Sequence, residues 1–284
     1  MRANWGLVLL PPLVLSMVLL FGPQIMFLRA SFYEDLGIGR LGPDFTFVNY
    51  ILAFTDSFYY ESLLLNFQLS ASVTLLSLLV AFPVAYRIAR MTSRWAMIVL
   101  AAIIVSAFLS VAIKILGMMI LFAANGALNR FLLWTGVITD TIGIIGTMPG
   151  IIFGLVHLSI SFKVLMLFSV IQTVPRSLEE AAEIHGAKRW RVYWRVVIPL
   201  SLPGIISVSL LSFNLVMGAF VSALVLGGGK IFTLPVLIQQ SLMLFSEFGM
   251  SAALSALLML FVFTINIISV ILVTRVHAAR LAVT

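Results

Sequence analysis

The chain has 284 residues, of which 62% are hydrophobic and 10% are charged, and its mean hydropathy is +1.18. Soluble domains carry about 25% charged residues, so this composition excludes a soluble globular protein and indicates an integral membrane protein. The net charge of +7 would suit a nucleic-acid-binding protein, but most basic residues flank apolar runs, which is the pattern of membrane topology. The sequence contains no cysteine, which excludes disulfides and thiolate metal sites.

Six apolar runs are each long enough to cross a hydrocarbon core about 30 Å thick. We expect the spans at residues 4–28, 62–86, 95–122, 141–168, 202–226 and 249–274. The first run is too long for the apolar region of a signal peptide, so we interpret it as a retained span. With a short interfacial helix at 49–54 in the first loop, the sequence predicts an all-α, polytopic membrane helical bundle of six transmembrane helices.

An even number of spans places both termini on one side of the membrane, and the basic residues indicate which side. The basic residues on the face with the termini are Arg2, Arg87, Arg90, Arg94, Arg176, Lys188, Arg189, Arg191, Arg195, Arg275 and Arg280. The opposite loops carry only Arg40, Arg130 and Lys230. Since cytoplasmic loops are enriched in Lys and Arg, we expect both termini to be cytoplasmic.

The longest strongly charged segment, residues 172–200, lies between the fourth and fifth predicted spans, and therefore on the cytoplasmic side. Ser177 is a candidate N-cap with Glu180 three residues later, which is the capping-box arrangement. Gly186 predicts the end of this first helix. Residues 188–197 predict a second helix, which Pro199 would end.

The first of these two helices has the composition of a docking surface. Glu179, Glu180 and Glu183 lie toward the positive end of its dipole, and Ala181 and Ala182 leave part of its surface small. The alternative is an amphipathic helix lying on anionic lipid. The basic second half of the segment fits that alternative, whereas the three glutamates do not.

The spacing of this segment resembles the EAA loop of binding-protein-dependent ABC importer permeases. The family pattern is E-A-A, three residues, G, nine residues and I-x-L-P; the chain keeps every spacing and ends in Val196-Val197-Ile198-Pro199. The resemblance implies a type I ABC importer permease fold, in which the loop 172–200 of a single transmembrane permease domain, residues 1–284, inserts into a cleft of a separate ATPase subunit. It assigns ATPase coupling to Glu179, Glu180, Ala181, Ala182, Gly186 and Pro199.

Two further segments, 112–129 and 219–240, are similar to regions of the spermidine/putrescine-type permeases. The chain departs from that group at Lys114, near its usual arginine, at Gly117, where tryptophan is common, and at Ser161, where many relatives have proline. The resemblance implies that the solute is a polyamine or a related organic compound. Opines, aminophosphonates, amino-acid-like compounds and metal chelates remain open.

The same resemblance implies the partners and the location of the chain. The partners are two ATP-binding subunits, a second permease subunit that is identical or homologous, membrane lipid, and a periplasmic solute-binding protein received by the outer loops 29–61, 123–140 and 227–249. The chain would lie in the bacterial inner membrane and bind no nucleic acid.

The sequence contains no nucleotide-binding motif of its own. Residues 227–230 read Gly-Gly-Gly-Lys, but Ile231 follows where the P-loop motif requires Ser or Thr. The histidines His157, His185 and His277 are far apart, and no cluster has metal-ligand spacing. We therefore expect no catalytic residue, metal or cofactor on this chain, with ATP and Mg²⁺ on the partner ATPase subunits.

Candidate residues of a translocation path are Lys114, Phe213, Asn214, Met217 and Phe220. An ionisable residue in a span is a functional candidate, so Lys114 either lines the path or extends to the outer interface. The four residues of the fifth span either line a pore or form ordinary packing, and packing is the favoured interpretation.

Three other ionisable residues receive structural interpretations. We expect Lys163 to extend to the cytoplasmic headgroups, His157 to be hydrogen-bonded inside the bundle, and Glu247 to be a solvated loop charge. A self-contained secondary carrier or channel is the alternative function. The sequence counts against it, because no paired intramembrane carboxylates are present.

Overall fold

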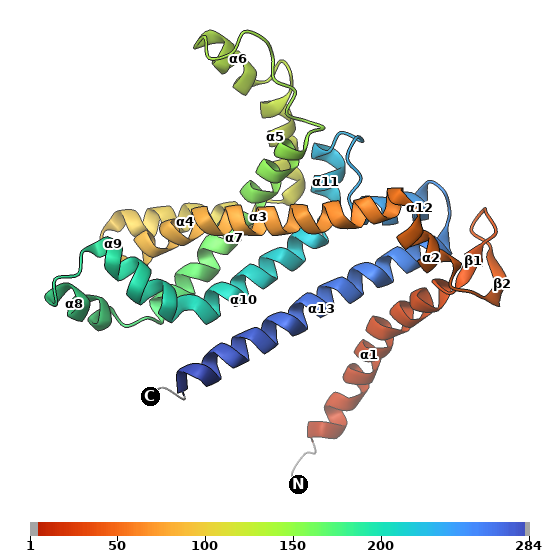
Figure 1. The fold of residues 1–284 in the computed structure, drawn as a ribbon, viewed down its shortest axis with the longest axis horizontal. Coiled ribbons are helices and arrows are strands. Elements are labelled where there is room, and N and C mark those ends of the chain that lie inside the picture. Colours follow the sequence, from red (N-terminus) through yellow and green to blue (C-terminus); the bar gives the residue numbers. More distant parts are fainter. Residues whose placement is uncertain (1–4, 282–284) are drawn as a thin grey trace. The chain divides into compact units, whose positions relative to one another are not determined.

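The computed structural model describes residues 5–281, with side chains described for residues 9–271 and 274. Contacts divide the chain into two compact units. Figure 1 shows the elements of both, coloured along the sequence from red at the N-terminus to blue at the C-terminus. Unit 1 comprises Met1–Leu64 and Leu234–Phe261, and unit 2 comprises Leu65–Thr233 and Val262–Thr284. Arg2 and the side chains of Arg275, His277 and Arg280 lie outside the described residues, so their predicted placement stays a prediction.

Within the described part of the chain, six helices are long and apolar enough to cross a membrane. They are Leu9–Ala30, Ser57–Arg90, Val111–Trp134, Met148–Gln172, Arg189–Met217 and Phe248–Ile271. The predicted number of spans is therefore confirmed, although several boundaries differ from the predicted ones.

Unit 1 contains α1 (Trp5–Ala30), the hairpin β1 (Tyr33–Asp35) and β2 (Leu41–Phe45), α2 (Val48–Thr55), the start of α3 (Ser57–Arg90), α12 (Leu234–Met243) and the start of α13 (Phe248–Leu281). Helix α2 confirms the predicted short helix at 49–54. The antiparallel hairpin was not predicted, because its strands are only 3 and 5 residues long and carry no sustained alternation.

Polar contacts fix the hairpin of unit 1 to the start of α13. The carboxylate of Asp35 accepts hydrogen bonds from the backbone N–H groups of Gly249 (2.9 Å) and Met250 (2.7 Å) in the first turn of that helix. An anionic acceptor at this place satisfies donors that lack intrahelical partners. Glu247 is half-buried beside them, so it is a loop charge, as predicted, but one that is only partly solvated.

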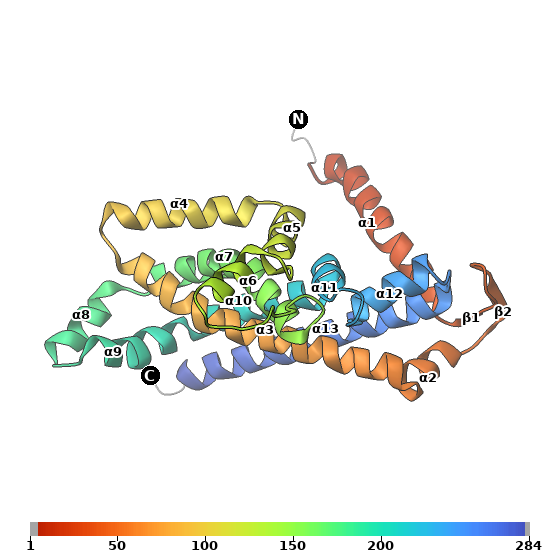
Figure 2. The ribbon, with the colours of Figure 1, turned by 90° about the horizontal axis from the view of Figure 1, so that it is seen from above.

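Unit 2 contains the rest of α3, then α4 (Arg94–Phe108), α5 (Val111–Phe122), α6 (Ala127–Trp134), α7 (Met148–Gln172), α8 (Arg176–Ile184), α9 (Arg189–Val192), the π-helical segment η1 (Tyr193–Val197), α10 (Ile198–Met217) and α11 (Phe220–Leu226), and the end of α13. Helix α7 packs against both α4 and α10. Helix α8 lies beyond the ends of α3 and α7, and α9 leads back from it toward α10, as both Figure 1 and Figure 2 show.

Two predicted spans of unit 2 are interrupted. The third, 95–122, is split into α4 and α5 because Leu109 and Ser110 are extended, with ψ of 135° and 133°. The fifth, 202–226, is split at Gly218, which ends α10 before α11 begins. Hydropathy records how long an apolar run is, but not where its backbone leaves the helical conformation.

Two hydrophobic clusters form the core of unit 2. The first, near the loop between α7 and α10, includes Ala81, Ala85, Leu167, Ile171 and Val197. The second includes Leu69, Val73, Ile151, Leu155 and Leu226 and joins α3, α5, α7, α10 and α11. The first cluster gives the charged loop a rigid base.

Candidate functional site

The charged loop between α7 and α10 folds as two short helices joined at Gly186, as the sequence predicts. Gly186 has φ of +81°, a left-handed conformation that glycine adopts without steric cost. Its N–H donates to the carbonyl of Glu183 (2.9 Å), and the N–H of Ala187 donates to that of Ala182 (3.0 Å). These two bonds form a Schellman motif, which ends α8 and reverses the chain.

The predicted start of the first helix is wrong by two residues. The N-cap is Pro175 rather than Ser177, it makes no side-chain capping bond, and the helix begins at Arg176. Proline already has a φ suited to the start of a helix and lacks the N–H that would otherwise have no partner.

The predicted stop at Pro199 is also wrong. The chain runs from α9 through the π-helical segment η1 directly into α10, and Pro199 lies in the first turn of α10. A proline in the first turn needs no backbone donor, so it is compatible with a helix that starts there. Arg189–Met217 is consequently one long apolar helix with a π-helical turn near its start.

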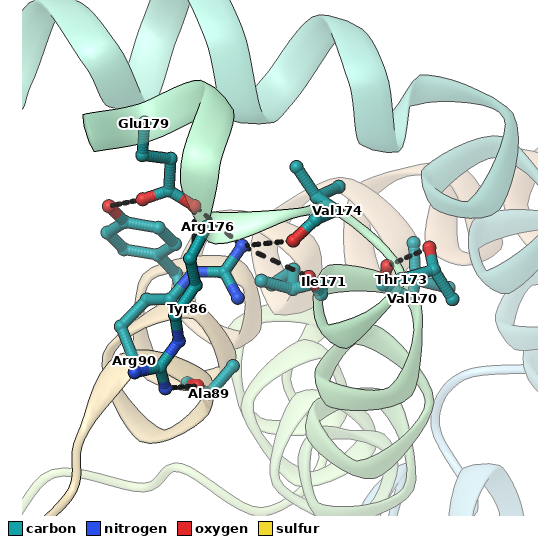
Figure 3. Close-up of polar contacts among 9 residues, drawn as sticks. All are labelled: Tyr86, Ala89, Arg90, Val170, Ile171, Thr173, Val174, Arg176 and Glu179. Atoms are coloured by element: carbon teal, nitrogen blue, oxygen red, sulfur yellow. Dashed lines mark hydrogen bonds and ion pairs between the residues drawn. The ribbon is translucent and has the colours of Figure 1, made fainter. Parts of the chain in front are cut away.

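A network centred on Arg90, the last residue of α3, holds α8 in place (Figure 3). Its Nε donates to Oε1 of Glu179 (2.7 Å), and its Nη2 lies 2.5 Å from the same oxygen. Nη2 also donates to the carbonyls of Val174 (2.9 Å) and Ile171 (3.3 Å). Tyr86 donates from its hydroxyl to the other carboxylate oxygen, Oε2 of Glu179 (2.9 Å).

The ion pair of this network is largely removed from solvent. The side chains of Arg90 and Glu179 are only 13% and 12% exposed. A second hydrogen bond between the two helices has its donor on α8: Nη2 of Arg176 donates to the carbonyl of Ala89 on α3 (3.1 Å). Charge-assisted bonds in a site of low water content are strong, so together they fix α8 to the end of α3.

These contacts give α8 two distinct faces. Glu179 and Ala182, three residues apart, are half-buried against the bundle, and Ala182 packs on the first hydrophobic cluster. Ser177, Glu180, Ala181 and Ile184 recur at i, i+3, i+4 and i+7 and are all exposed, with Ile184 83% exposed. We call these four residues the outer face of α8.

The predicted coupling residues therefore separate into two groups. Glu180 and Ala181 lie on the outer face, whereas Glu179 and Ala182 contact the bundle and Gly186 and Pro199 shape the chain. Ile184 was not among the predicted residues. Its position four residues after Glu180 is the helical spacing that could have identified it.

The predicted translocation-path residues do not converge on one site. Phe213 is buried with its ring 5.9 Å from that of Phe67, and Asn214 exchanges side-chain hydrogen bonds with Asn266 at 3.1 and 3.2 Å. The carbonyl and Sδ of Met217 accept from Nδ2 of Asn66. Lys114 is half-buried on α5, and Phe220 alone of the five lines the cavity described next.

A cavity of about 320 Å³ lies between α5, α7, α10 and α11, with apolar walls and the polar groups of Ser159, Ser212, Ser222 and Lys163. Lys163 is 1% exposed, so the expectation that it extends to the headgroups was wrong. Its Nζ donates to the carbonyl of Thr74 (2.9 Å) and to Oγ of Ser77. Lys163 lies nine residues from the end of α7, about 14 Å at 1.5 Å per residue.

The fold and this loop define a class: a polytopic helical membrane protein with a short, rigidly anchored helix outside its spans. Residues 74–278 match the family model described as binding-protein-dependent transport system inner membrane component. The chain belongs to that family, and it is the permease subunit of a binding-protein-dependent ABC importer.

Individual relatives agree with this membership. The chain is 34% identical over 210 residues to the spermidine/putrescine transport system permease protein PotB of Escherichia coli (strain K12), covering 74% of this chain and 76% of that one. It is 28% identical over 233 residues to PotB of Haemophilus influenzae, covering 82% and 81% of the two chains. A bacterial ABC transporter that imports the acidic polysaccharide alginate has the same fold, with a TM-score of 0.78, 18% identity and 96% of both chains covered.

Proposed function

We propose that this permease carries a polyamine or a related organic compound across the bacterial inner membrane. Separate ATPase subunits, which bind the outer face of α8, would drive this transport. A periplasmic binding protein would deliver the solute to the outer loops, and both termini would lie in the cytoplasm. Two ATPase subunits and a second permease chain, identical or homologous, would complete the importer. ATP and Mg²⁺ would be bound by the ATPase subunits.

The observation that carries this proposal is the anchored and two-faced helix α8. Its inner face is fixed to α3 by Arg90 and Glu179, while its outer face exposes a carboxylate, a methyl group and a large aliphatic side chain. Among the described residues, Glu180 makes no ion pair. An exposed apolar residue beside an unpaired charge is suited to binding in a cleft of another protein. Because α8 is fixed to the bundle, a movement of that protein would also move the transmembrane helices.

The polyamine assignment is supported by the identity to PotB over three quarters of the chain. The described cavity in unit 2 is an unsuitable site for such a cation, because the ionisable side chain that lines it is the lysine Lys163. Like charges at close range in a medium of low dielectric constant repel strongly. We therefore infer that the binding protein, rather than this cavity, selects the cation.

The test replaces residues of the outer face and measures both uptake and association. Glu180→Arg is expected to lower uptake of radiolabelled spermidine or putrescine by about tenfold or more, since reversing an interfacial charge costs at least the equivalent of one tenfold step. Gly186→Asp is expected to do the same by disturbing the turn. The ATPase subunits should no longer copurify with either variant.

Asp140→Arg is the matched control, because it reverses a charge in an exposed loop outside α8. The ATPase subunits should copurify with this variant as with the unmodified chain. Normal uptake by Glu180→Arg, with the variant present in the membrane, would contradict the proposed coupling. Normal ATPase association without uptake of any polyamine would leave the coupling intact and reject the substrate.

A further inference from the structure

A second surface feature of unit 2 lies beside the anchor of α8 but outside its outer face. It is a groove of about 610 Å³ between the last turns of α3 on one side and α9, η1 and α10 on the other. Its walls are almost entirely apolar, and Leu79, Leu202 and Ile205 form one end of the lining. We call it the α3–α10 groove.

The opposite end of the groove is basic. Arg87 and Arg189 both line it, from α3 and α9. Arg87 is exposed and makes no ion pair in the part of the chain that the structure describes. Arg189 forms an ion pair with Glu183 at 3.8 Å, but its side chain is 89% exposed, so the pair is loose and open to solvent. Both guanidinium groups are therefore available to an added anion.

Aromatic side chains lie along the same wall. Trp190 and Trp194 line the groove and are 71% and 50% exposed, and the ring of Tyr193 stacks on Trp190 at a centroid distance of 5.9 Å. Tryptophan and tyrosine are enriched where a membrane meets water. The aromatic residues therefore mark this end of the groove as the level of the lipid headgroups.

The distance between the two ends suits a lipid chain. Leu79 and Arg87 lie eight residues apart on α3, about 12 Å at 1.5 Å per residue, so the apolar walls extend about that far from the basic end. A ligand that fits must carry an anionic head on an aliphatic tail. A free phosphate would leave the apolar walls uncovered. An aliphatic segment alone would leave Arg87 without a counter-ion and Arg189 with only the exposed ion pair to Glu183.

We propose that the α3–α10 groove binds an anionic phospholipid. The phosphate lies between Arg87 and Arg189, and one acyl chain lies along Leu79, Leu202 and Ile205. Basic pockets between spans are the sites at which anionic headgroups bind, and arginine pairs well with phosphate. The assignment of this lipid to the cytoplasmic leaflet rests on the orientation given under Proposed function. The groove and the chemical class of its ligand do not depend on that orientation.

The bound lipid would touch the anchor of α8 through one residue. Tyr86 lines the groove and also donates a hydrogen bond to Oε2 of Glu179 at 2.9 Å. The headgroup is therefore placed against the residue that helps to hold the coupling helix. The content of anionic lipid in the membrane would then influence how firmly α8 is held.

The experiment uses the two tryptophans of the groove as reporters. The full chain has five tryptophans, and Trp5→Phe, Trp95→Phe and Trp134→Phe leave only Trp190 and Trp194. This chain is reconstituted into phosphatidylcholine vesicles that contain a small fixed fraction of either brominated phosphatidylglycerol or brominated phosphatidylcholine. Brominated phosphatidylglycerol should quench the fluorescence with an apparent affinity about fivefold higher or more.

Variants then test each half of the site. Arg87→Gln with Arg189→Gln should abolish the preference for phosphatidylglycerol, whereas Arg94→Gln with Arg191→Gln, which removes the same charge from exposed residues that do not line the groove, should retain it. Ile205→Phe, which fills the apolar end, should weaken quenching by both lipids with all arginines present. Gel filtration confirms that each variant is folded.

Three results would overturn the proposal. The first is equal quenching by the two brominated lipids in the unmodified groove. The second is an unchanged preference for phosphatidylglycerol after Arg87 and Arg189 are replaced. The third is the absence of quenching by either lipid, which would mean that protein, such as a second copy of the chain, covers the groove.

Discussion

The guanidinium of Arg90, at the end of α3, contacts three separate pieces of the chain. The end of α7 supplies the carbonyl of Ile171, the loop after it supplies the carbonyl of Val174, and α8 supplies the carboxylate of Glu179. A lysine could not make all these bonds, because it presents a single nitrogen rather than a planar fork. The position of α8 relative to α3 thus depends strongly on one side chain.

A double-mutant cycle on Arg90→Met and Glu179→Gln should show strong coupling between the two positions. Each single change leaves a mostly buried charge without its partner, so each should lower thermal stability, and the double variant should lose less than the sum. We expect an interaction energy of about 1–3 kcal/mol, measured from thermal unfolding in detergent. Tyr86→Phe, which removes one hydrogen bond, is a milder control, and simple additivity would contradict the anchor.

Glu247 should make the stability of unit 1 depend on pH. Burial, and then the nearby charge of Asp35, raise the pKa of the Glu247 carboxyl above its ordinary value of 4.5. The folded chain therefore disfavours the charged form, and this penalty is fully present above the raised pKa and disappears as the pH falls below 4.5.

Glu247→Gln should accordingly be more stable than the unmodified chain at neutral pH, with the difference vanishing in acid. Thermal midpoints measured across the pH range in detergent check this. Glu34→Gln, at an exposed position of the same unit, is the comparison and should show a smaller effect. An advantage of Glu247→Gln that persists unchanged at low pH would disagree with the stated cause.

At the scale of elements, the turn between α8 and α9 depends on backbone conformation rather than on packing. Gly186 has φ of +81°, and a Cβ added there would meet no atom within 4 Å. Gly186→Val should lower the free energy of unfolding by about 1–2 kcal/mol, the cost of a left-handed conformation, and Gly186→Asn by less. Thermal midpoints of the two variants measure the difference, and equal effects would argue against a conformational cause.

The elements that the sequence predicted best are those with a strong local signal. The six apolar runs, helix α2 and the glycine turn all follow from composition or from one residue's conformational preference. The breaks at Leu109 and Gly218 and the π-helical segment leave no such signal, because Leu, Ser, Gly, Tyr and Val all occur in continuous membrane helices.

The site was predictable only in part, for a physical reason. The spacing from Glu180 to Pro199 indicated the loop that we propose as the coupling site, but the ion pair of Arg90 and Glu179 joins residues 89 positions apart. Such a contact depends on tertiary packing, which a local pattern does not contain. Lys163 was misplaced for the same reason, since its acceptors Thr74 and Ser77 belong to another helix.

At the scale of the whole molecule, the absence of cysteine offers a direct test of orientation, because any introduced thiol is the only one in the chain. Ser177→Cys, on the outer face of α8, should react with a membrane-impermeant maleimide only in inside-out vesicles. Thr139→Cys, in the exposed loop after α6, should react only in right-side-out vesicles or intact spheroplasts. Labelling of both from the same side would reject the proposed topology.

The π-helical segment Tyr193–Val197 has a consequence for the tolerance of this region to changes in length. A π-helical turn contains one residue more than an α-helical turn, so deleting one residue here would leave a regular and continuous α-helix. The five residues of the π-helical segment turn the chain about as far as four residues of an α-helix, so the helices on either side of the deletion would keep nearly the same directions. Shortening the chain by this single position would thus keep the helix intact and leave Glu180 and Ile184 facing the same way, whereas a deletion in the regular part of α10 would turn them by about 100°.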